Sequence, residues 1–334
     1  MQQATSMSAP PTLFLPSAAE LDAAARAVYC AMPPTPQYSW PLINAALDAH
    51  AWIKHENHSP IGAFKVRGGL VYMQALVRHH PEVEGVVCAT RGNHGQSIAF
   101  AARRHGLHTT IVVPRVNSVE KNAAMRALGA RLIEVGADVQ ESKEYAQELA
   151  AREGLHFIPS FHPDLLAGVA TSWCELFRAQ PDLDLVLVPI GVGTGVCGAV
   201  AARHALGLKT RIIGVVSSHA PAYQLSFRAR HSIEAPVTTV LADGMACRVA
   251  DRDGLATMLE CVDDVLAVND DEIARAMRLY YRSTHNLAEG AGAAALAGAL
   301  QIKDGGLIRG RKIGLPISGG NVDSELFRHV LQGD

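Results

Sequence analysis

Between residues 85 and 158 the chain alternates short apolar runs with longer segments in which apolar residues recur every three or four positions. The runs favour strands, and the longer segments favour amphipathic helices. The predicted strands are 85–90, 109–113, 131–135 and 156–158, and the predicted helices are 93–105, 118–128 and 139–152. Strands that alternate with helices predict a parallel sheet covered by helices on both faces.

The same alternation returns in the second half of the chain. Further strands are predicted at 51–55, 183–188, 210–216, 263–268 and 312–317, and further helices at 17–31, 165–178, 196–206, 270–283, 289–300 and 323–331. Ser17 and Glu20 form a capping box at the start of the first helix, and we expect Asp270 to cap a later one. We expect residues 1–16 to form a disordered or loose arm and residues 33–38 to form a loop.

Composition and charge exclude several classes of protein. The 334 residues are 49% hydrophobic and 19% charged, which is typical of a globular enzyme. The net charge of −2 and the lack of a basic block imply neither a nucleic acid nor an anionic membrane as partner. No signal peptide and no membrane-spanning segment is recognisable. The six cysteines lack a Cys-x-x-Cys pair and indicate a reducing cytoplasm, and the 15 histidines lack the spacing of a metal site.

One lysine stands out in the stretch 59–69, Ser-Pro-Ile-Gly-Ala-Phe-Lys-Val-Arg-Gly-Gly. Lys65 lies where a turn leads into a predicted amphipathic helix, and the partial positive charge of a helix start favours a neutral amine. A desolvated lysine has a lowered pKa and can act as a base or as a Schiff-base nucleophile. The alternative is a surface lysine that extends past Phe64 to solvent.

A glycine loop at 189–198, Pro-Ile-Gly-Val-Gly-Thr-Gly-Val-Cys-Gly, lies between a predicted strand and a predicted helix. The backbone N–H groups of such a loop form an anion site, to which Thr194 can add its hydroxyl. The same letters contain the dinucleotide fingerprint, so a nicotinamide-dependent oxidoreductase is an alternative function. That fingerprint expects an acid at the end of the next strand, where this chain has Ser217 and Ser218.

Together with Thr-Arg-Gly-Asn-His-Gly-Gln at 90–96 and Ile-Ser-Gly-Gly-Asn at 317–321, these stretches resemble the fold-type II pyridoxal-phosphate enzymes. The chain looks most like the serine/threonine dehydratase and serine racemase family, from about Leu13 to its end. The resemblance implies an α/β fold of the tryptophan synthase β type, with two three-layer αβα domains and mainly parallel sheets. It also implies a small domain at 83–162 inserted into a larger domain made of 13–82 and 163–334.

The resemblance implies a role for each motif residue. Lys65 takes the place of the catalytic Schiff-base lysine. The residues expected to bind pyridoxal 5'-phosphate are Phe64, Asn93, Gly191, Val192, Gly193, Thr194, Gly195 and Ser318. Those expected to bind the substrate are Thr90, Arg91, Gly92 and His94, with Gly92 permitting a tight turn. Glu289 lies where the family often has an acid near the active site. The alternatives are an N-cap for Asn93, a chain-turning serine for Ser318 and a first-turn glutamate favoured by the helix dipole for Glu289.

The resemblance predicts a cytoplasmic lyase that converts a β-hydroxy-α-amino acid such as threonine or serine to a 2-keto acid and ammonia. Its partners would be the small amino acid and a second copy of the chain in a homodimer. A β-replacement synthase of the same fold is an alternative, disfavoured because Asn93 is followed by His94 where those enzymes usually have threonine.

Two departures from the racemases within this family narrow the function. Their divalent cation is held by acids where this chain has Val216 and Ala222, which have no side-chain oxygen, so we expect no metal there. Their second base is a serine where this chain has Arg91, which cannot take up a proton, so we expect no two-base racemase. Arg91 is predicted either to brace its loop or to bind an acidic or polar group of the substrate.

Overall fold

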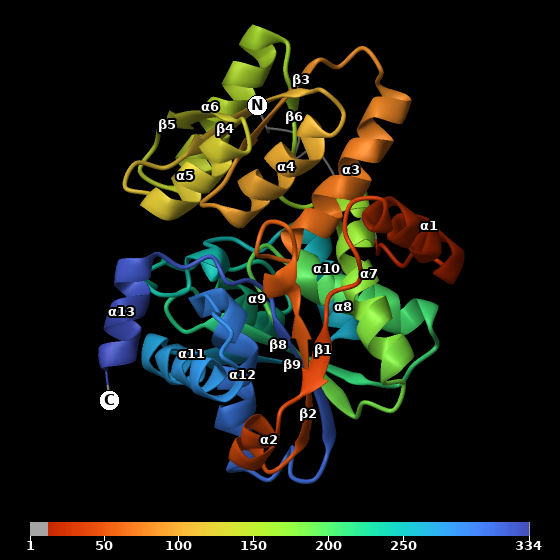
Figure 1. The fold of residues 1–334 in the computed structure, drawn as a ribbon, viewed down its shortest axis with the longest axis vertical. Helices are drawn as coiled ribbons and strands as arrows, with labels where there is room; N and C mark the ends of the chain where they lie inside the picture. The colour runs from red at the N-terminus through yellow and green to blue at the C-terminus, as the bar shows by residue number, and fades with distance from the viewer. Residues whose placement is uncertain (1–12, 334) are drawn as a thin grey trace, which may run out of the picture.

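The computed structural model describes residues 13–333, which form two separate sheets with helices around them (Figure 1). The larger sheet has six strands in the order β1-β2-β10-β7-β8-β9, and the smaller has four in the order β5-β4-β3-β6. Every strand pairing in these two sheets is parallel except that of β1 with β2. The predicted α/β class with mainly parallel sheets is therefore confirmed.

The bounds of the elements are these. The strands are β1 (Gln37–Ser39), β2 (His50–His55), β3 (Gly85–Ala89), β4 (His108–Val113), β5 (Arg131–Glu134), β6 (His156–Phe157), β7 (Leu185–Pro189), β8 (Arg211–Ser217), β9 (Asp264–Val268) and β10 (Lys312–Ile317). The helices are α1 (Ala18–Tyr29), α2 (Pro41–Leu47), α3 (Lys65–His79), α4 (Asn93–Arg103), α5 (Val119–Ala127), α6 (Val139–Glu153), α7 (Pro163–Ala179), α8 (Thr194–Ala205), α9 (Ala222–Ala229), α10 (Arg252–Cys261), α11 (Asp270–Thr284), α12 (Gly290–Lys303) and α13 (Ser324–Gln332). Two short 3-10 turns are η1 (Glu56–His58) and η2 (Asp243–Met245).

The ends of two helices test the predicted caps. Ser17 and Glu20 form the expected capping box at α1. At α11 the cap is Asn269, which forms a capping box with Glu272, so the expectation for Asp270 is wrong. The Asp270 carboxylate instead accepts hydrogen bonds from the distant loop at 239–241, including one from the Thr239 hydroxyl.

Short elements at the edge of the larger sheet differ from the prediction. The predicted loop at 33–38 is wrong at its end, because β1 begins at Gln37 and pairs antiparallel with β2. β1 is short and mostly exposed, so it has no apolar alternation from which it can be predicted. The helices α2, α9 and α10 were not predicted either, and each is at most ten residues long. The predicted arm at 1–16 lies mostly outside the described residues.

The helix that carries Lys65 is held by close backbone contact with α7. A side chain at Gly68 would meet the Leu165 carbonyl oxygen at 2.7 Å, and one at Gly168 would meet the Arg67 carbonyl oxygen at 2.2 Å. Only glycine permits two helices to approach this closely. The contact fixes the start of α3 relative to the larger sheet, and so fixes the position of Lys65.

The smaller sheet is made of strands within residues 85–157, inside the segment 83–162 predicted as an inserted domain. Figure 1 shows this sheet and its helices α4, α5 and α6 at one end of the molecule and the larger sheet at the other. The domain limits themselves stay a prediction. Within residues 13–333, the helices are all too short or too polar to span a lipid bilayer.

Candidate active site

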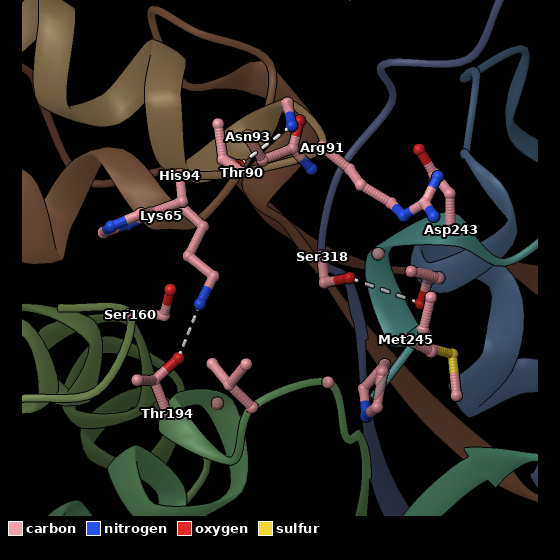
Figure 2. A pocket seen from close by; sticks show the side chains of 18 of the residues that line it. Lys65, Thr90, Arg91, Asn93, His94, Ser160, Thr194, Asp243, Met245 and Ser318 are labelled. Atoms are coloured by element: carbon pink, nitrogen blue, oxygen red, sulfur yellow. Dashed lines mark hydrogen bonds between the residues drawn. The ribbon is translucent and has the colours of Figure 1, made fainter. Parts of the chain in front are cut away.

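A cavity lies between the two sheets, at the carboxyl ends of β7 and β10 of the larger sheet and of β3 of the smaller sheet. Ligands bind at the carboxyl ends of strands in open α/β sheets. It is lined by the loop residues that follow each of these strands and by the start of α3 (Figure 2). All thirteen candidate residues lie in its wall: Phe64, Lys65, Thr90, Arg91, Gly92, Asn93, His94, Gly191, Val192, Gly193, Thr194, Gly195 and Ser318. The fold thus brings together four motifs that are far apart in sequence.

Lys65 is the first residue of α3, and its amine donates a 2.8 Å hydrogen bond to the Thr194 hydroxyl across the cavity. The amine also lies 5.1 Å from the centre of the Phe64 ring. Desolvation lowers the pKa of Lys65 from 10.5 to about 8, because burial penalises the charged form. The alternative of a solvated surface lysine is therefore wrong, and far more of the amine is neutral at pH 7 than in a solvated lysine.

The glycine loop connects β7 to α8 and is held in place by Tyr223. The Tyr223 hydroxyl donates to the Val192 carbonyl oxygen at 2.8 Å. Gly193 has a φ of +99°, and a side chain there would meet the Tyr223 hydroxyl at 2.9 Å. Both constraints require glycine at this position. The loop places the first N–H groups of α8 at the cavity, beside Thr194, where they form a site for an anion.

Asn93 is the first residue of α4, and Gly92 takes the N-cap position without a side-chain bond. The interpretation of Asn93 as an N-cap is therefore wrong. Its amide group donates to Glu289 Oε1 at 2.6 Å and accepts from Asn321 Nδ2 at 2.8 Å. The side chain is thus held across the cavity wall by two partners from later parts of the chain.

Gly92 has a packing reason for being glycine in addition to the turn expected. A side chain at this position would meet the Lys121 Cδ atom at 2.4 Å. Gly92 is needed because the Lys121 stem packs directly against the loop.

The cavity wall contains three more charged residues, Lys121, Asp243 and Glu289. No role was predicted from the sequence for the first two, and a helix-dipole role was favoured for Glu289. Lys121 forms ion pairs with Asp243 at 2.7 Å and with Glu289 at 3.2 Å. Burial raises the pKa of Glu289 above its ordinary value, and the nearby charge of Lys121 opposes this only in part. Glu289 precedes α12 as its N-cap but makes no capping bond, so the preferred interpretation as a dipole-favoured glutamate does not describe its contacts. The Asp243-Gly244 dipeptide was the available signal for a turn at this point.

Ser318 follows β10 and is buried at the cavity wall. Its hydroxyl donates to the Ala291 carbonyl oxygen at 3.4 Å, which is long for such a bond. The backbone carbonyl of Ser318 accepts from the Phe64 N–H at 2.9 Å and so ties the lysine loop to the end of β10. Ser318 therefore also positions the chain before Lys65, and its hydroxyl remains available to a ligand.

Comparisons with known proteins identify the family. Residues 31–319 match the family described as "Pyridoxal-phosphate dependent enzyme". The chain belongs to this family. It is 32% identical over 325 residues to the biosynthetic L-threonine dehydratase of Salmonella typhimurium, which covers 96% of this chain and 63% of that protein. The chain therefore spans somewhat less than two thirds of that relative's length.

Two further proteins are similar to this chain over nearly their whole length. The L-threo-3-hydroxyaspartate ammonia-lyase of Saccharomyces cerevisiae is 31% identical over 300 residues, covering 90% of this chain and 91% of that protein. The processed form of threonine deaminase isoform 2 from Solanum lycopersicum has a TM-score of 0.87 at 28% identity, covering 97% of this chain and 96% of that structure. The predicted fold type and the pyridoxal-phosphate cofactor are confirmed, and the nicotinamide alternative is wrong.

The cavity fits this cofactor. It holds a lysine amine of lowered pKa in contact with an anion site at the start of a helix. Two buried nitrogen atoms in its wall, Nε of Arg91 and Nε2 of His94, find no hydrogen-bond partner within residues 13–333. Desolvation, with help from the charge of Lys65, lowers the pKa of His94 to about 3, so its ring is neutral. The cavity therefore offers polar atoms that a ligand can satisfy.

The described residues contain no group of three or more His, Cys, Asp or Glu side chains placed to hold a metal ion. Val216 lies buried in β8, and Ala222 begins α9. The expectation that these positions bind no cation stays a prediction.

Proposed function

We propose that the protein is a pyridoxal-phosphate-dependent lyase that converts a β-hydroxy-α-amino acid, such as threonine or serine, to a 2-keto acid and ammonia. The observation that carries the proposal is the contact between the Lys65 amine and Thr194, which joins a nucleophilic lysine to a helix-start anion site. The relatives named above are a threonine dehydratase, a threonine deaminase and a hydroxyaspartate ammonia-lyase, all of which the proposal accommodates.

The proposed roles follow the places of the side chains in the cavity. Lys65 would hold the cofactor as a Schiff base, and the glycine loop 191–195 would hold its phosphate. Phe64 would pack against the cofactor, Asn93 would bind its ring hydroxyl, and Ser318 would face its pyridine nitrogen. When bound, the cofactor withdraws electrons from the Cα atom of the substrate.

Lys65 supplies the base for the reaction. When it is free of the cofactor, the Lys65 amine would take the proton from Cα, which its lowered pKa favours. The Cα–H electrons would form the Cα–Cβ double bond as the β-hydroxyl leaves as water, taking the proton that this leaving group needs from the phosphate of the bound cofactor. The released enamine then adds water and loses ammonia to give the 2-keto acid.

The loop 90–94 is proposed to bind the substrate carboxylate through the first backbone N–H groups of α4. These groups have no partner inside the helix, and the helix dipole favours an anion there. Thr90 supports this geometry because its hydroxyl accepts from the Gly92 N–H at 3.0 Å. Arg91 cannot serve as a second base, so the reaction would run from the Lys65 side alone, without two-base racemisation.

The experiment is a keto-acid release screen across β-hydroxy amino acids, with borohydride reduction of the enzyme in parallel. We expect a visible absorption band that borohydride bleaches and, by mass spectrometry, an adduct on Lys65. Lys65→Ala is expected to fold but to lose both the band and turnover, because no other lysine amine bonds to Thr194 among residues 13–333. An adduct on Lys54 or Lys121 would refute the assignment, and a β-replacement product without keto acid would favour the synthase.

Three expectations from the family resemblance also stay proposals: a homodimer, a cytoplasmic location, and an inserted small domain at 83–162. Light scattering at working concentration tests the first of these, and a monomer would contradict it. Limited proteolysis near residues 83 and 162 tests the domain limits.

A further inference from the structure

Arg91 lies in the cavity wall and has no carboxylate partner among residues 13–333. It is half-buried, and its Nε atom is completely buried without a hydrogen-bond partner. Across residues 13–333, the guanidinium makes neither a hydrogen bond nor an ion pair, and the single bond recorded at Arg91 is to its backbone carbonyl, from Asn117. The side chain therefore does not brace its own loop, which removes one of the two roles considered for it.

The carboxylates near Arg91 are already engaged by another cation. Asp243 pairs with Lys121 at 2.7 Å, and Glu289 pairs with Lys121 at 3.2 Å and accepts from Asn93 at 2.6 Å. Neither lies within ion-pair distance of the Arg91 guanidinium. A guanidinium is always ionised, so its charge and its planar fork of donors are open to an anion that enters the cavity.

The other anionic groups expected in the cavity have binding sites elsewhere. The cofactor phosphate is assigned to the loop at Thr194, and the substrate α-carboxylate to the backbone N–H groups at the start of α4. Figure 2 shows Thr194 beside the Lys65 amine, whereas the Arg91 side chain extends away from both, towards Asp243. Arg91 is therefore left for an anion that neither the cofactor phosphate nor a monocarboxylic substrate supplies.

We propose that Arg91 binds a second carboxylate, on the substrate side chain, and that the substrate is a 3-hydroxy dicarboxylic α-amino acid. This inference rests on the lyase function proposed above. Arg91 acts as a specificity residue: it pairs bidentately with the distal carboxylate, while Lys65 acts on Cα. Serine and threonine lack that carboxylate and leave the guanidinium unpaired in the cavity, which penalises their binding.

The first experiment measures keto-acid release by the holoenzyme from L-threo-3-hydroxyaspartate, L-serine and L-threonine. We expect wild type to prefer the dicarboxylate in kcat/KM. Arg91→Gln should lower kcat/KM for hydroxyaspartate about 10- to 100-fold, mainly through KM, which is the range that a hydrogen bond to a charged group supplies. Serine and threonine should change by less than about threefold, and Arg91→Lys should recover part of the loss for hydroxyaspartate alone.

Arg115→Gln is the matched control, because Arg115 is an exposed arginine in the neighbouring loop and outside the cavity wall. It removes the same charge and should leave the preference unchanged. Equal losses on all three substrates in Arg91→Gln would overturn the proposal, because they would place Arg91 on the α-carboxylate or in a structural role. A wild type that prefers serine or threonine would overturn it as well.

The second experiment measures binding and does not depend on turnover. L-Aspartate and L-asparagine have the same shape, lack the β-hydroxyl and differ in side-chain charge, so their binding can be followed by the change in the visible absorption of the holoenzyme. We expect wild type to bind aspartate at least about tenfold more tightly, and Arg91→Gln to bind both equally. Equal binding by wild type overturns the Arg91 site. If no hydroxy amino acid yields keto acid but aspartate is still preferred, the lyase function fails and the anion site stands.

Discussion

Glu56 and Glu289 are both almost fully buried and both paired with a cation, yet their pKa values shift in opposite directions. Burial works to raise the pKa of both carboxyl groups. At Glu56 the charge and hydrogen bonds of Arg67 outweigh burial, and the pKa falls below its ordinary value. At Glu289 burial outweighs the charge of Lys121, and the pKa rises. The two glutamates belong to two separate charge clusters, one around Arg67 and one around Lys121.

The cluster around Arg67 is closed. Its guanidinium pairs with Glu56 at 2.8 Å and with Glu175 at 2.6 Å, and Lys54 pairs with Glu175 at 2.5 Å. The Thr35 and Ser172 hydroxyls add donors to Glu56 at 2.6 Å and 2.7 Å. Two positive charges face two negative ones, and none of the four is more than 8% exposed. Such a network of short contacts holds its side chains in one geometry, which suits a structural support two residues beyond Lys65.

The cluster around Lys121 is open. Lys121 pairs with two carboxylates. The Asp243 side chain is 29% exposed, and Glu289 accepts a hydrogen bond from Asn93 and so holds it in place. Arg91 lies in the same wall with no partner inside residues 13–333. The two regions therefore differ in how their charges are paired. The charges of the closed cluster, which support the fold, are fully paired, whereas the cavity wall leaves Arg91 without a partner, which a ligand can supply.

The largest effect on stability is expected from Arg67→Met, which removes the shared cation of the closed cluster. Glu56 and Glu175 would then be buried with only Lys54 between them. Removing one partner of a buried ion pair typically costs about 3–5 kcal/mol. Chemical unfolding of the holoenzyme followed by circular dichroism measures the loss.

Adding Glu56→Gln to Arg67→Met is the control, because it removes one of the uncompensated charges at nearly constant shape. The double variant should recover part of the lost stability. A cost below about 1 kcal/mol for Arg67→Met would place the closed cluster among surface ion pairs and would contradict the comparison.

A smaller loss of stability is expected from Lys121→Met, the same kind of substitution in the open cluster. Asp243 is partly exposed and can be hydrated, and the raised pKa of Glu289 allows it to take up a proton. We expect a cost of about 1–2 kcal/mol, closer to that of a lost hydrogen bond to a charged group. Turnover should fall by more than stability suggests, because the Lys121 stem supports the loop at Gly92.

The measurement is the same unfolding curve, paired with kcat and KM on the best substrate from the keto-acid screen. A loss of stability as large as that of Arg67→Met would show that both clusters hold the fold equally. Unchanged turnover would show that the loop at Gly92 does not depend on Lys121.

The alternation of apolar runs was sufficient to predict nine of the ten strands, because buried parallel strands require continuous apolar runs. β1 escaped because an exposed edge strand of three residues has no such requirement. The motif residues of the cavity were predictable because glycine, asparagine and a lone lysine at strand ends have few other reasons to occur together.

Lys121, Asp243 and Arg67 were not predictable in the same way. Lys121 and Asp243 are 122 residues apart, and no local pattern links them. On an amphipathic helix, the sequence pattern assigns a lysine or an arginine to the face exposed to solvent. Whether such a residue is buried depends on partners from other elements of the fold. The pairing of charges across the fold is tertiary information, and a single sequence does not contain it in periodic form.

The smallest effect on stability, below about 1 kcal/mol at neutral pH, is expected from Glu289→Gln, because the amide keeps the shape and can still contact Asn93 and Lys121. The effect of this substitution on the free energy of unfolding depends on pH. The folded carboxyl has a raised pKa, so above the ordinary value of 4.5 the native state binds more protons than the unfolded state. Its contribution to stability is fully present below pH 4.5 and is lost as pH rises through the folded pKa. Glu289→Gln should therefore remove a decline in stability on the alkaline side of pH 4.5, measured by unfolding at a series of pH values.

The matched variant Glu56→Gln should act on the opposite side, because the lowered pKa of Glu56 contributes stability that is lost as pH falls below 4.5. If both variants changed the pH profile in the same direction, the two clusters would not differ in the way their contacts indicate.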